Sequence, residues 1–143
     1  MPYLIVKNGK KAIALYEEIF GAKVINHQPF SKEMGMHGIP ADFDFENSTM
    51  HAELEISGAT IYISDNPVSP KFESSGNVEV YLELDSKKQL EKFYKKAKEK
   101  GSVIKMELQK TFWGSFYTRL QDPEGVGWQL GFQPEGLVFQ PEG

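Results

Sequence analysis

Strict alternation of apolar and polar residues marks residues 49–57 and 78–85, and it predicts a β-strand in each place. Neighbouring side chains of a strand point to opposite faces, so each strand has one apolar and one polar face. In the first strand the two faces are Ala52, Leu54 and Ile56 against His51, Glu53 and Glu55. Gly58 permits a tight turn, after which residues 59–64 return as the neighbouring strand of a hairpin.

Two other segments have the spacing of amphipathic helices. The first lies between Asn8, a helix-capping residue, and Gly21, which suits a helix end. The second begins after Ser86, which forms a capping box with Gln89, and ends at Gly101. The apolar stripes expected to be buried are Ala12, Leu15, Tyr16, Ile19 and Phe20 in the first helix, and Leu90, Phe93, Tyr94 and Ala97 in the second.

The order of elements occurs twice along the chain. Val6 and Leu84 lie 78 residues apart at equivalent places, and the helix-ending glycines lie 80 apart. We therefore predict an α+β fold of two βαβββ modules, in which each module needs its twin to close a core. The expected organisation is one domain over 1–132, with modules 1–65 and 77–132, a linker over 66–76 and a tail over 133–143. The loop over residues 31–48 is long enough to act as a lid over a site.

Composition narrows the classes of partner. The chain has 143 residues, a net charge of −4 and no cysteine, which excludes disulfides, thiolate metal sites and a thiol nucleophile. A negative chain has no general attraction to nucleic acid or anionic lipid. No apolar run approaches the ~18 residues of a membrane span, and no secretory signal is present. We expect a cytoplasmic protein without nucleic-acid or membrane partners.

The polar faces of the strands hold the candidate chemistry. They carry His51, Glu53, Glu55, Tyr62, Glu79, Tyr81, Glu83, Tyr117, Arg119 and Gln129. Such a face is either solvated, as is usual in antiparallel sheets, or the lining of a ligand cavity. Tyrosines, an arginine and carboxylates together favour the cavity.

Several motifs carry a family resemblance. They are Pro2-Tyr-Leu-Ile-Val6, Ala14-Leu-Tyr16 with Phe20-Gly21, Met50-His-Ala-Glu-Leu54, Ser64-Asp65, Leu108-Gln-Lys-Thr-Phe-Trp-Gly114, and Asp122-Pro with Gly125-Val and Trp128. The sequence resembles the vicinal oxygen chelate superfamily of glyoxalase I, extradiol dioxygenases and bleomycin-resistance proteins, and within it the PhnB-like branch. The resemblance implies the glyoxalase/bleomycin-resistance/dihydroxybiphenyl dioxygenase fold, a curved mixed sheet around a cavity, commonly in a homodimer.

In the metal-using members four ligands come from four strands. The corresponding positions here are Met1, Tyr62, Glu79 and Gln129, of which only Glu79 is a good ligand for a divalent ion. His51 with Glu53 adds two donors on one strand face, and His51 is more simply a residue that lines the cavity. We therefore expect no metal and no other cofactor, with Glu79 as a weak metal candidate.

Two further groups of residues each allow two interpretations. Phe112 and Trp113 either fill the entrance of the cavity or form a flat apolar wall for a planar ligand. In the second case the indole N–H is available as a hydrogen-bond donor to the ligand. Arg119 either clamps a carboxylate or phosphonate or is neutralised in ion pairs with Glu53, Glu55 and Glu83, and we favour the ion pairs.

Three functions follow from this pattern. The first is metal-independent binding of a small molecule in a pocket lined by Trp113, Tyr117, Tyr62 and Phe30, with Arg119, Glu53 and Gln129 in contact. The second is a lyase, isomerase or dioxygenase that uses a divalent ion or a Glu79–His51 acid–base pair. The third is a dimeric scaffold with a vestigial cavity. A methyltransferase activity, a label that some relatives carry, has little support, because no glycine-rich nucleotide loop follows the first strand.

Overall fold

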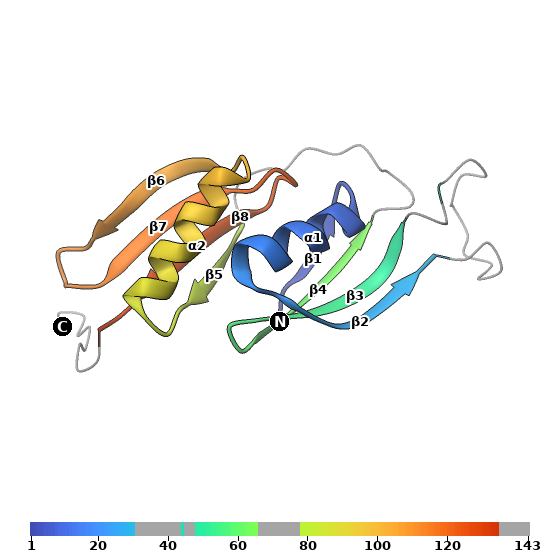
Figure 1. The fold of residues 1–143 in the computed structure, drawn as a ribbon, viewed down its shortest axis with the longest axis horizontal. Helices are drawn as coiled ribbons and strands as arrows, with labels where there is room; N and C mark the ends of the chain where they lie inside the picture. Colours follow the sequence, from blue (N-terminus) through green and yellow to red (C-terminus); the bar gives the residue numbers. More distant parts are fainter. Residues whose placement is uncertain (31–43, 45–47, 66–77, 135–143) are drawn as a thin grey trace.

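The fold contains the predicted βαβββ unit twice (Figure 1). The structure is a computed structural model that describes residues 1–30, 44, 48–65 and 78–134. The first module consists of β1 (Tyr3–Val6), α1 (Gly9–Phe20), β2 (Lys23–Pro29), β3 (Thr49–Ile56) and β4 (Ala59–Asp65). The second consists of β5 (Glu79–Glu83), α2 (Lys87–Glu99), β6 (Val103–Lys110), β7 (Phe116–Gln121) and β8 (Gly127–Phe132). The predicted α+β fold class is confirmed.

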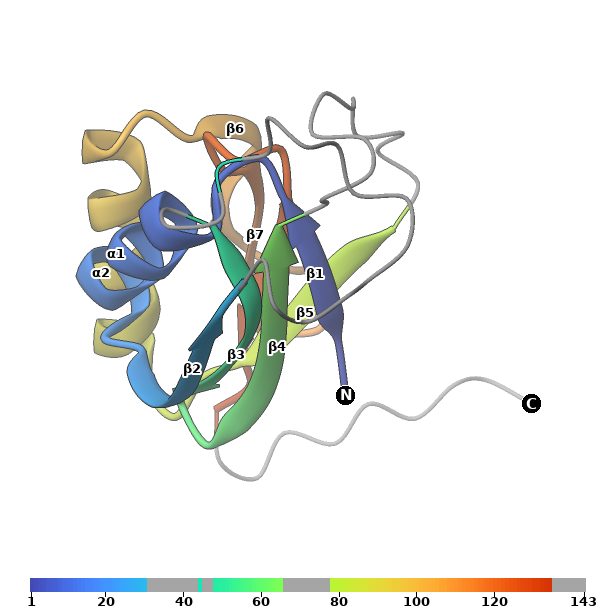
Figure 2. The same ribbon diagram turned by 90° about the vertical axis from the view of Figure 1, so that its right-hand side faces the viewer.

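Strand pairing gives each module its own mixed sheet. The strand orders are β1-β4-β3-β2 and β5-β8-β7-β6, so the predicted curved sheet consists of two four-stranded sheets. In each sheet the first strand pairs in parallel with the last, and the other pairs are antiparallel. Both helices lie on the same side of the sheets (Figure 2). The opposite side is called the helix-averted face below.

The helix boundaries follow from local capping. Asn8 Oδ1 accepts a hydrogen bond from Lys11 N at 3.0 Å, and Gly21 ends α1 at φ 62°. Ser86 Oγ accepts from Gln89 N at 3.0 Å, while Gln89 Oε1 accepts from Asp85 N at 2.9 Å. The predicted capping box is therefore present. Its reciprocal bond reaches the amide one residue before the cap.

Aliphatic side chains of both sheets form the core beneath the helices. Leu54 is fully buried, as the alternation predicted, and so are Ile61, Ile63, Leu120 and Leu130. The stripe of α2 is narrower than expected, because Tyr94 is only half-buried and packs against the ammonium group of Lys98. Leu90, Phe93 and Ala97, spaced at three and four residues, are enough to cover the sheet.

Helix α1 also packs on the second module. The Tyr16 hydroxyl and the Trp128 indole N–H each donate to Asp122 Oδ2 at 2.7 Å. The Phe20 ring contacts the rings of Phe93 and Trp128, with centroids 5.5 and 4.8 Å apart. Burial raises the pKa of Asp122, although these hydrogen bonds act in the opposite direction.

Carboxylates from both modules meet the amino end of α1. Gly9 N donates to Asp65 Oδ1 at 2.9 Å, and Asn8 N donates to Glu124 Oε1 at 2.7 Å. Asp65 lies at the end of β4, and Glu124 lies in the turn between β7 and β8. Negative charge at this end complements the helix dipole and occupies N–H groups that have no partner within the helix.

Three predicted segments lie outside the described residues. They are the lid over 31–48, apart from residues 44 and 48, the linker over 66–76, and the tail beyond residue 134. In the described part of the chain, no helix is both long and apolar enough to cross a membrane.

Candidate functional site

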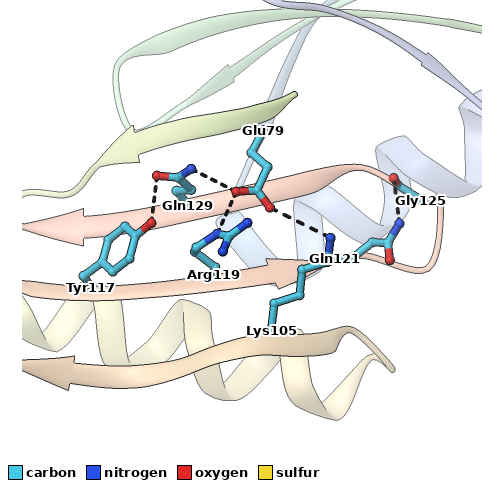
Figure 3. Close-up of polar contacts among 7 residues, drawn as sticks. All are labelled: Glu79, Lys105, Tyr117, Arg119, Gln121, Gly125 and Gln129. Atoms are coloured by element: carbon cyan, nitrogen blue, oxygen red, sulfur yellow. Dashed lines mark hydrogen bonds and ion pairs between the residues drawn. The ribbon is translucent and has the colours of Figure 1, made fainter. Parts of the chain in front are cut away.

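A polar network on the helix-averted face of the second sheet is the candidate site (Figure 3). Arg119 on β7 donates through Nε to Glu79 Oε1 at 2.8 Å, and Gln129 on β8 donates through Nε2 to the same oxygen at 2.9 Å. The Tyr117 hydroxyl donates to Gln129 Oε1 at 2.9 Å. Three strands thus hold one carboxylate in a fixed orientation.

Glycine in β8 makes this arrangement possible. Glu79 pairs with Gly127 across the parallel ladder, and a β-carbon at Gly127 would lie 2.8 Å from Glu79 Cγ. Gly131 does the same for Tyr81, whose hydroxyl would collide with a β-carbon there. The side chains of β5 therefore lie across β8, toward the middle of the sheet.

A β-bulge in β6 supplies a second cation. The register passes from Ile104–Leu120 directly to Met106–Arg119, which leaves Lys105 as the extra residue. The Thr118 hydroxyl donates to the Met106 carbonyl at 2.7 Å across the irregular ladder. Lys105 points toward Glu79 (Figure 3), and its Nζ lies 4.0 Å from Glu79 Oε2. Bulges of this kind redirect side chains next to functional sites.

The network keeps its carboxylate ionised. The Glu79 side chain is 5% exposed, and the hydrogen bond from Arg119 is the main reason that its pKa lies below the usual range. The same interaction raises the pKa of Arg119. Glu79 Oε2 is buried and has no hydrogen-bond partner among the described residues. With one carboxylate and two cations, the group carries a net charge of +1.

The first sheet carries a separate aromatic cluster on its strands. The His51 ring lies 5.7 Å from Tyr3 and 4.8 Å from Tyr62, measured between centroids. The Tyr3 hydroxyl is 3.4 Å from His51 Nδ1. Glu53 is the cross-strand neighbour of Tyr62.

The structure brings some predicted residues together and separates others. Glu79, Tyr117, Arg119 and Gln129 share one network, whereas His51 and Tyr62 belong to the other sheet. Among the described residues, no hydrogen bond or ion pair joins His51 to Glu79. The ionic partner of Arg119 is Glu79, not one of the glutamates favoured from the sequence.

The predicted aromatic wall is also divided. Phe112 and Trp113 form the tip between β6 and β7, where Phe112 is 93% exposed and Trp113 is 38% exposed. Phe30 is buried directly after β2. The β6–β7 tip and the end of β2 lie at opposite ends of the molecule (Figure 1). Within one chain, Trp113 and Phe30 therefore do not line the same pocket.

A groove of about 460 Å³ lies on the helix side of the described residues. Its lining includes Phe20 of α1, Phe93 of α2 and the residues at the start of α2. None of the predicted site residues lines this groove. The groove lies between the end of α1 and the start of α2, not on the polar face of the strands.

Comparison with known proteins places the chain in a family. The model of the Glyoxalase/Bleomycin resistance protein/Dioxygenase superfamily matches residues 2–130. The chain belongs to this superfamily. Protein YjdN from Escherichia coli (strain K12) is 30% identical over 138 residues, which cover 90% of this chain and 91% of YjdN.

Solved structures show the same superfamily fold. Protein PA1353 from Pseudomonas aeruginosa matches with a TM-score of 0.71 at 28% identity, covering 92% of this chain and 95% of that one. A Bacillus cereus PhnB protein, described as a putative 3-demethylubiquinone-9 3-methyltransferase, matches with a TM-score of 0.72 at 17% identity. The match covers 93% of this chain and 98% of that one. The predicted resemblance is confirmed for the superfamily, and the PhnB protein shares its fold.

The positions that the resemblance implies for metal ligands do not form a set of donors for a divalent ion in this structure. Met1 is 79% exposed, and Tyr62 contacts Tyr3 and His51 rather than Glu79. Glu79 itself accepts two hydrogen bonds and is flanked by the cations of Arg119 and Lys105, which repel a dication. No group of three or more His, Cys, Asp or Glu side chains suited to a metal occurs in the described ranges. These residues do not fit a catalytic divalent site.

Proposed function

We propose that this protein binds a small organic molecule on the helix-averted face of its sheets without a divalent ion in the site. The observation that carries the proposal is the ion pair between Glu79 and Arg119 at 2.8 Å. A metal ligand must offer its lone pairs to the ion, but the oxygens of this carboxylate face a guanidinium, an amide and an ammonium group. The fixed carboxylate instead supports direct recognition of an organic ligand.

The surroundings of Glu79 support the binding of an amphipathic molecule. Tyr81 is 49% exposed beside the network, and Tyr117 presents its ring on the same face. Tyrosine combines a large apolar surface with one polar group, so it suits ligands that have both characters. Of the pocket residues predicted from the sequence, Tyr117, Arg119 and Gln129 enter this proposal. Trp113, Phe30, Tyr62 and Glu53 lie away from this network and enter the proposal only through a second copy of the chain.

The proposal includes a homodimer. The outer strand β2 has Val24 and Ile25 exposed by 43% and 55%, at an irregularity in its pairing with β3. Val103 of the outer strand β6 is 61% exposed. Apolar outer strands of this kind are protected in many proteins by a partner. Light scattering after size exclusion tests this part, and a monomer at all concentrations would contradict it.

A thermal-shift screen tests the binding function. The probes are aromatic and amphipathic compounds, applied with excess EDTA and then with Mn²⁺, Ni²⁺ or Zn²⁺. A ligand that binds only the folded state raises the unfolding midpoint. We expect organic hits that persist in EDTA and weaken when Arg119 is replaced by Met. Hits that appear only with a metal ion, or stoichiometric metal binding that Glu79→Gln abolishes, would refute the proposal and favour a metal-dependent enzyme.

A further inference from the structure

We propose that the bound molecule carries an oxyanion, a carboxylate or phosphate, which binds between the guanidinium of Arg119 and the ammonium of Lys105. This inference rests on the proposed binding function and specifies the class of ligand. It starts from the donors that the network leaves unused. Four features of the site support it: the guanidinium, the bulge, the charge balance and the tyrosines.

The guanidinium of Arg119 has capacity for a second anion. Its Nε donates to Glu79, and no hydrogen bond from its two terminal nitrogens occurs among the described residues. A guanidinium has five N–H donors in one plane, so an anion can bind the terminal nitrogens while Nε stays on Glu79. The side chain is 33% exposed, which leaves these nitrogens accessible. Glu79 thus fixes the orientation of Arg119 without using its outer edge.

The pairing of β6 with β7 does not require Lys105. A regular ladder would not need the extra residue between Ile104 and Met106, yet the bulge directs this lysine onto the face of Arg119. Its Nζ lies 4.0 Å from Glu79 Oε2, beyond hydrogen-bond distance, and its side chain is 30% exposed. An ammonium group with three donors in this position can bind an anion and remain close to Glu79.

The charge balance favours an anion over a neutral ligand. Glu79 neutralises one cation, so Arg119 and Lys105 together leave one positive charge unmatched in the network. The net charge of the whole chain is −4, so this local excess is opposite to the average.

Two tyrosines indicate that the part of the ligand beyond its oxyanion is flat and apolar. Tyr81 and Tyr117 lie on the same face, on either side of Gly131. Burial raises the pKa of both hydroxyl groups, which remain neutral donors at physiological pH. A ligand that places its oxyanion on Arg119 and Lys105 can set a flat apolar body against these rings. An aromatic acid of modest size meets both conditions.

The experiment compares matched probes by isothermal titration of the full chain in EDTA. Benzoate and phenyl phosphate carry the oxyanion on a flat ring, and benzamide is the neutral analogue of benzoate. We expect both anions to bind at least about tenfold more tightly than benzamide, and the tighter anion identifies the oxyanion class. Added salt should weaken binding of the anions more than binding of benzamide.

Matched variants assign the binding to this site. Lys105→Met keeps the length of the side chain and removes the charge, and it should weaken binding of the anions by about tenfold. Lys95→Met, at an exposed position of α2 outside the groove, is the control and should leave the affinity unchanged. Lys105→Arg should retain most of the affinity, which separates charge from any effect on folding.

The outcomes separate this inference from the proposed function. Equal affinity for benzamide and benzoate, or unchanged affinity in Lys105→Met, would overturn the oxyanion inference and leave the binding function standing. Failure of all three probes to bind would also overturn the inference. Binding of the anions only when Mn²⁺ is added would overturn the proposed function itself.

Discussion

Gly127 and Glu79 are cross-strand partners, and a β-carbon on the glycine would lie 2.8 Å from Cγ of the glutamate. The glycine therefore determines where the carboxylate of the candidate site lies. Gly127→Ala should move Glu79 away from Arg119 and destabilise the fold by about 1–3 kcal/mol, the usual cost of overpacking.

Urea unfolding of a double-mutant cycle checks this prediction. In the Glu79→Ala background no Cγ is present, so Gly127→Ala should cost much less there than in the natural sequence. Equal costs in both backgrounds would show that the glycine serves another purpose.

The dependence of Glu79 on Arg119 predicts a change with pH. Because the folded pKa of Glu79 is lowered, its contribution to stability is present above the unfolded pKa and is lost as pH falls through the folded pKa. Arg119→Met removes the main cause of this lowered pKa. The variant should be less stable than the natural protein at neutral pH, and the difference should shrink in acid. Urea midpoints over a pH series measure it, and a constant difference would contradict the ion pair.

The buried hydroxyl of Tyr16 should matter for stability. Tyr16→Phe removes the 2.7 Å hydrogen bond to Asp122 and leaves a buried carboxylate with one donor fewer. We expect a loss of about 1–3 kcal/mol in the free energy of unfolding. Tyr94→Phe is the matched control, since Tyr94 is half-buried and its hydroxyl makes no hydrogen bond within the described residues. Equal effects of the two variants would show that the Asp122 contact adds no stability.

Trp128 should report the protonation of Asp122. The indole N–H donates to this carboxylate at 2.7 Å, so indole fluorescence should change when Asp122 binds a proton. With Trp113 replaced by Phe, the titration midpoint should lie above about 3.9, the ordinary value of Asp, because burial raises the pKa.

The same shift fixes the sign of the effect on stability. Since the folded pKa of Asp122 is raised, the burial cost applies above that pKa and is relieved as pH falls through it toward the unfolded value. Asp122→Asn should abolish the fluorescence titration. A transition that survives in Asp122→Asn would have to come from another group, and Glu124, whose pKa burial also raises, is the first to test by Glu124→Gln.

The sequence predicted the elements well because their signals are local. Alternation located β3 and β4, and caps located both helices to within a residue or two. The network around Glu79 was only partly predictable, because its members meet through the register of strands far apart in the chain. Lys105 was missed, since a bulge shifts which face a residue occupies and leaves no mark in an alternating pattern.

The predicted ion-pair partners of Arg119 were wrong for a related reason. Charge alone could not rank Glu79 above Glu53, Glu55 and Glu83, because all are carboxylates on polar strand faces. The choice depends on Gly127, whose missing side chain lets Glu79 lie across β8. The signal for Glu79 was Gly127 itself, because a glycine within a strand leaves room for a side chain of the neighbouring strand.

The contacts of helix α1 join the beginning of the chain to its carboxyl-terminal hairpin. Asp122 follows Tyr16 by 106 residues, yet it completes the surroundings of that ring, and Glu124 completes the amino end of the same helix. An isolated first half would leave aromatic rings in water and a helix end without its second counter-charge. The first half therefore lacks two contacts of α1 until the carboxyl-terminal hairpin is present, and we expect halves produced separately to be more stable when they are mixed than when they are apart.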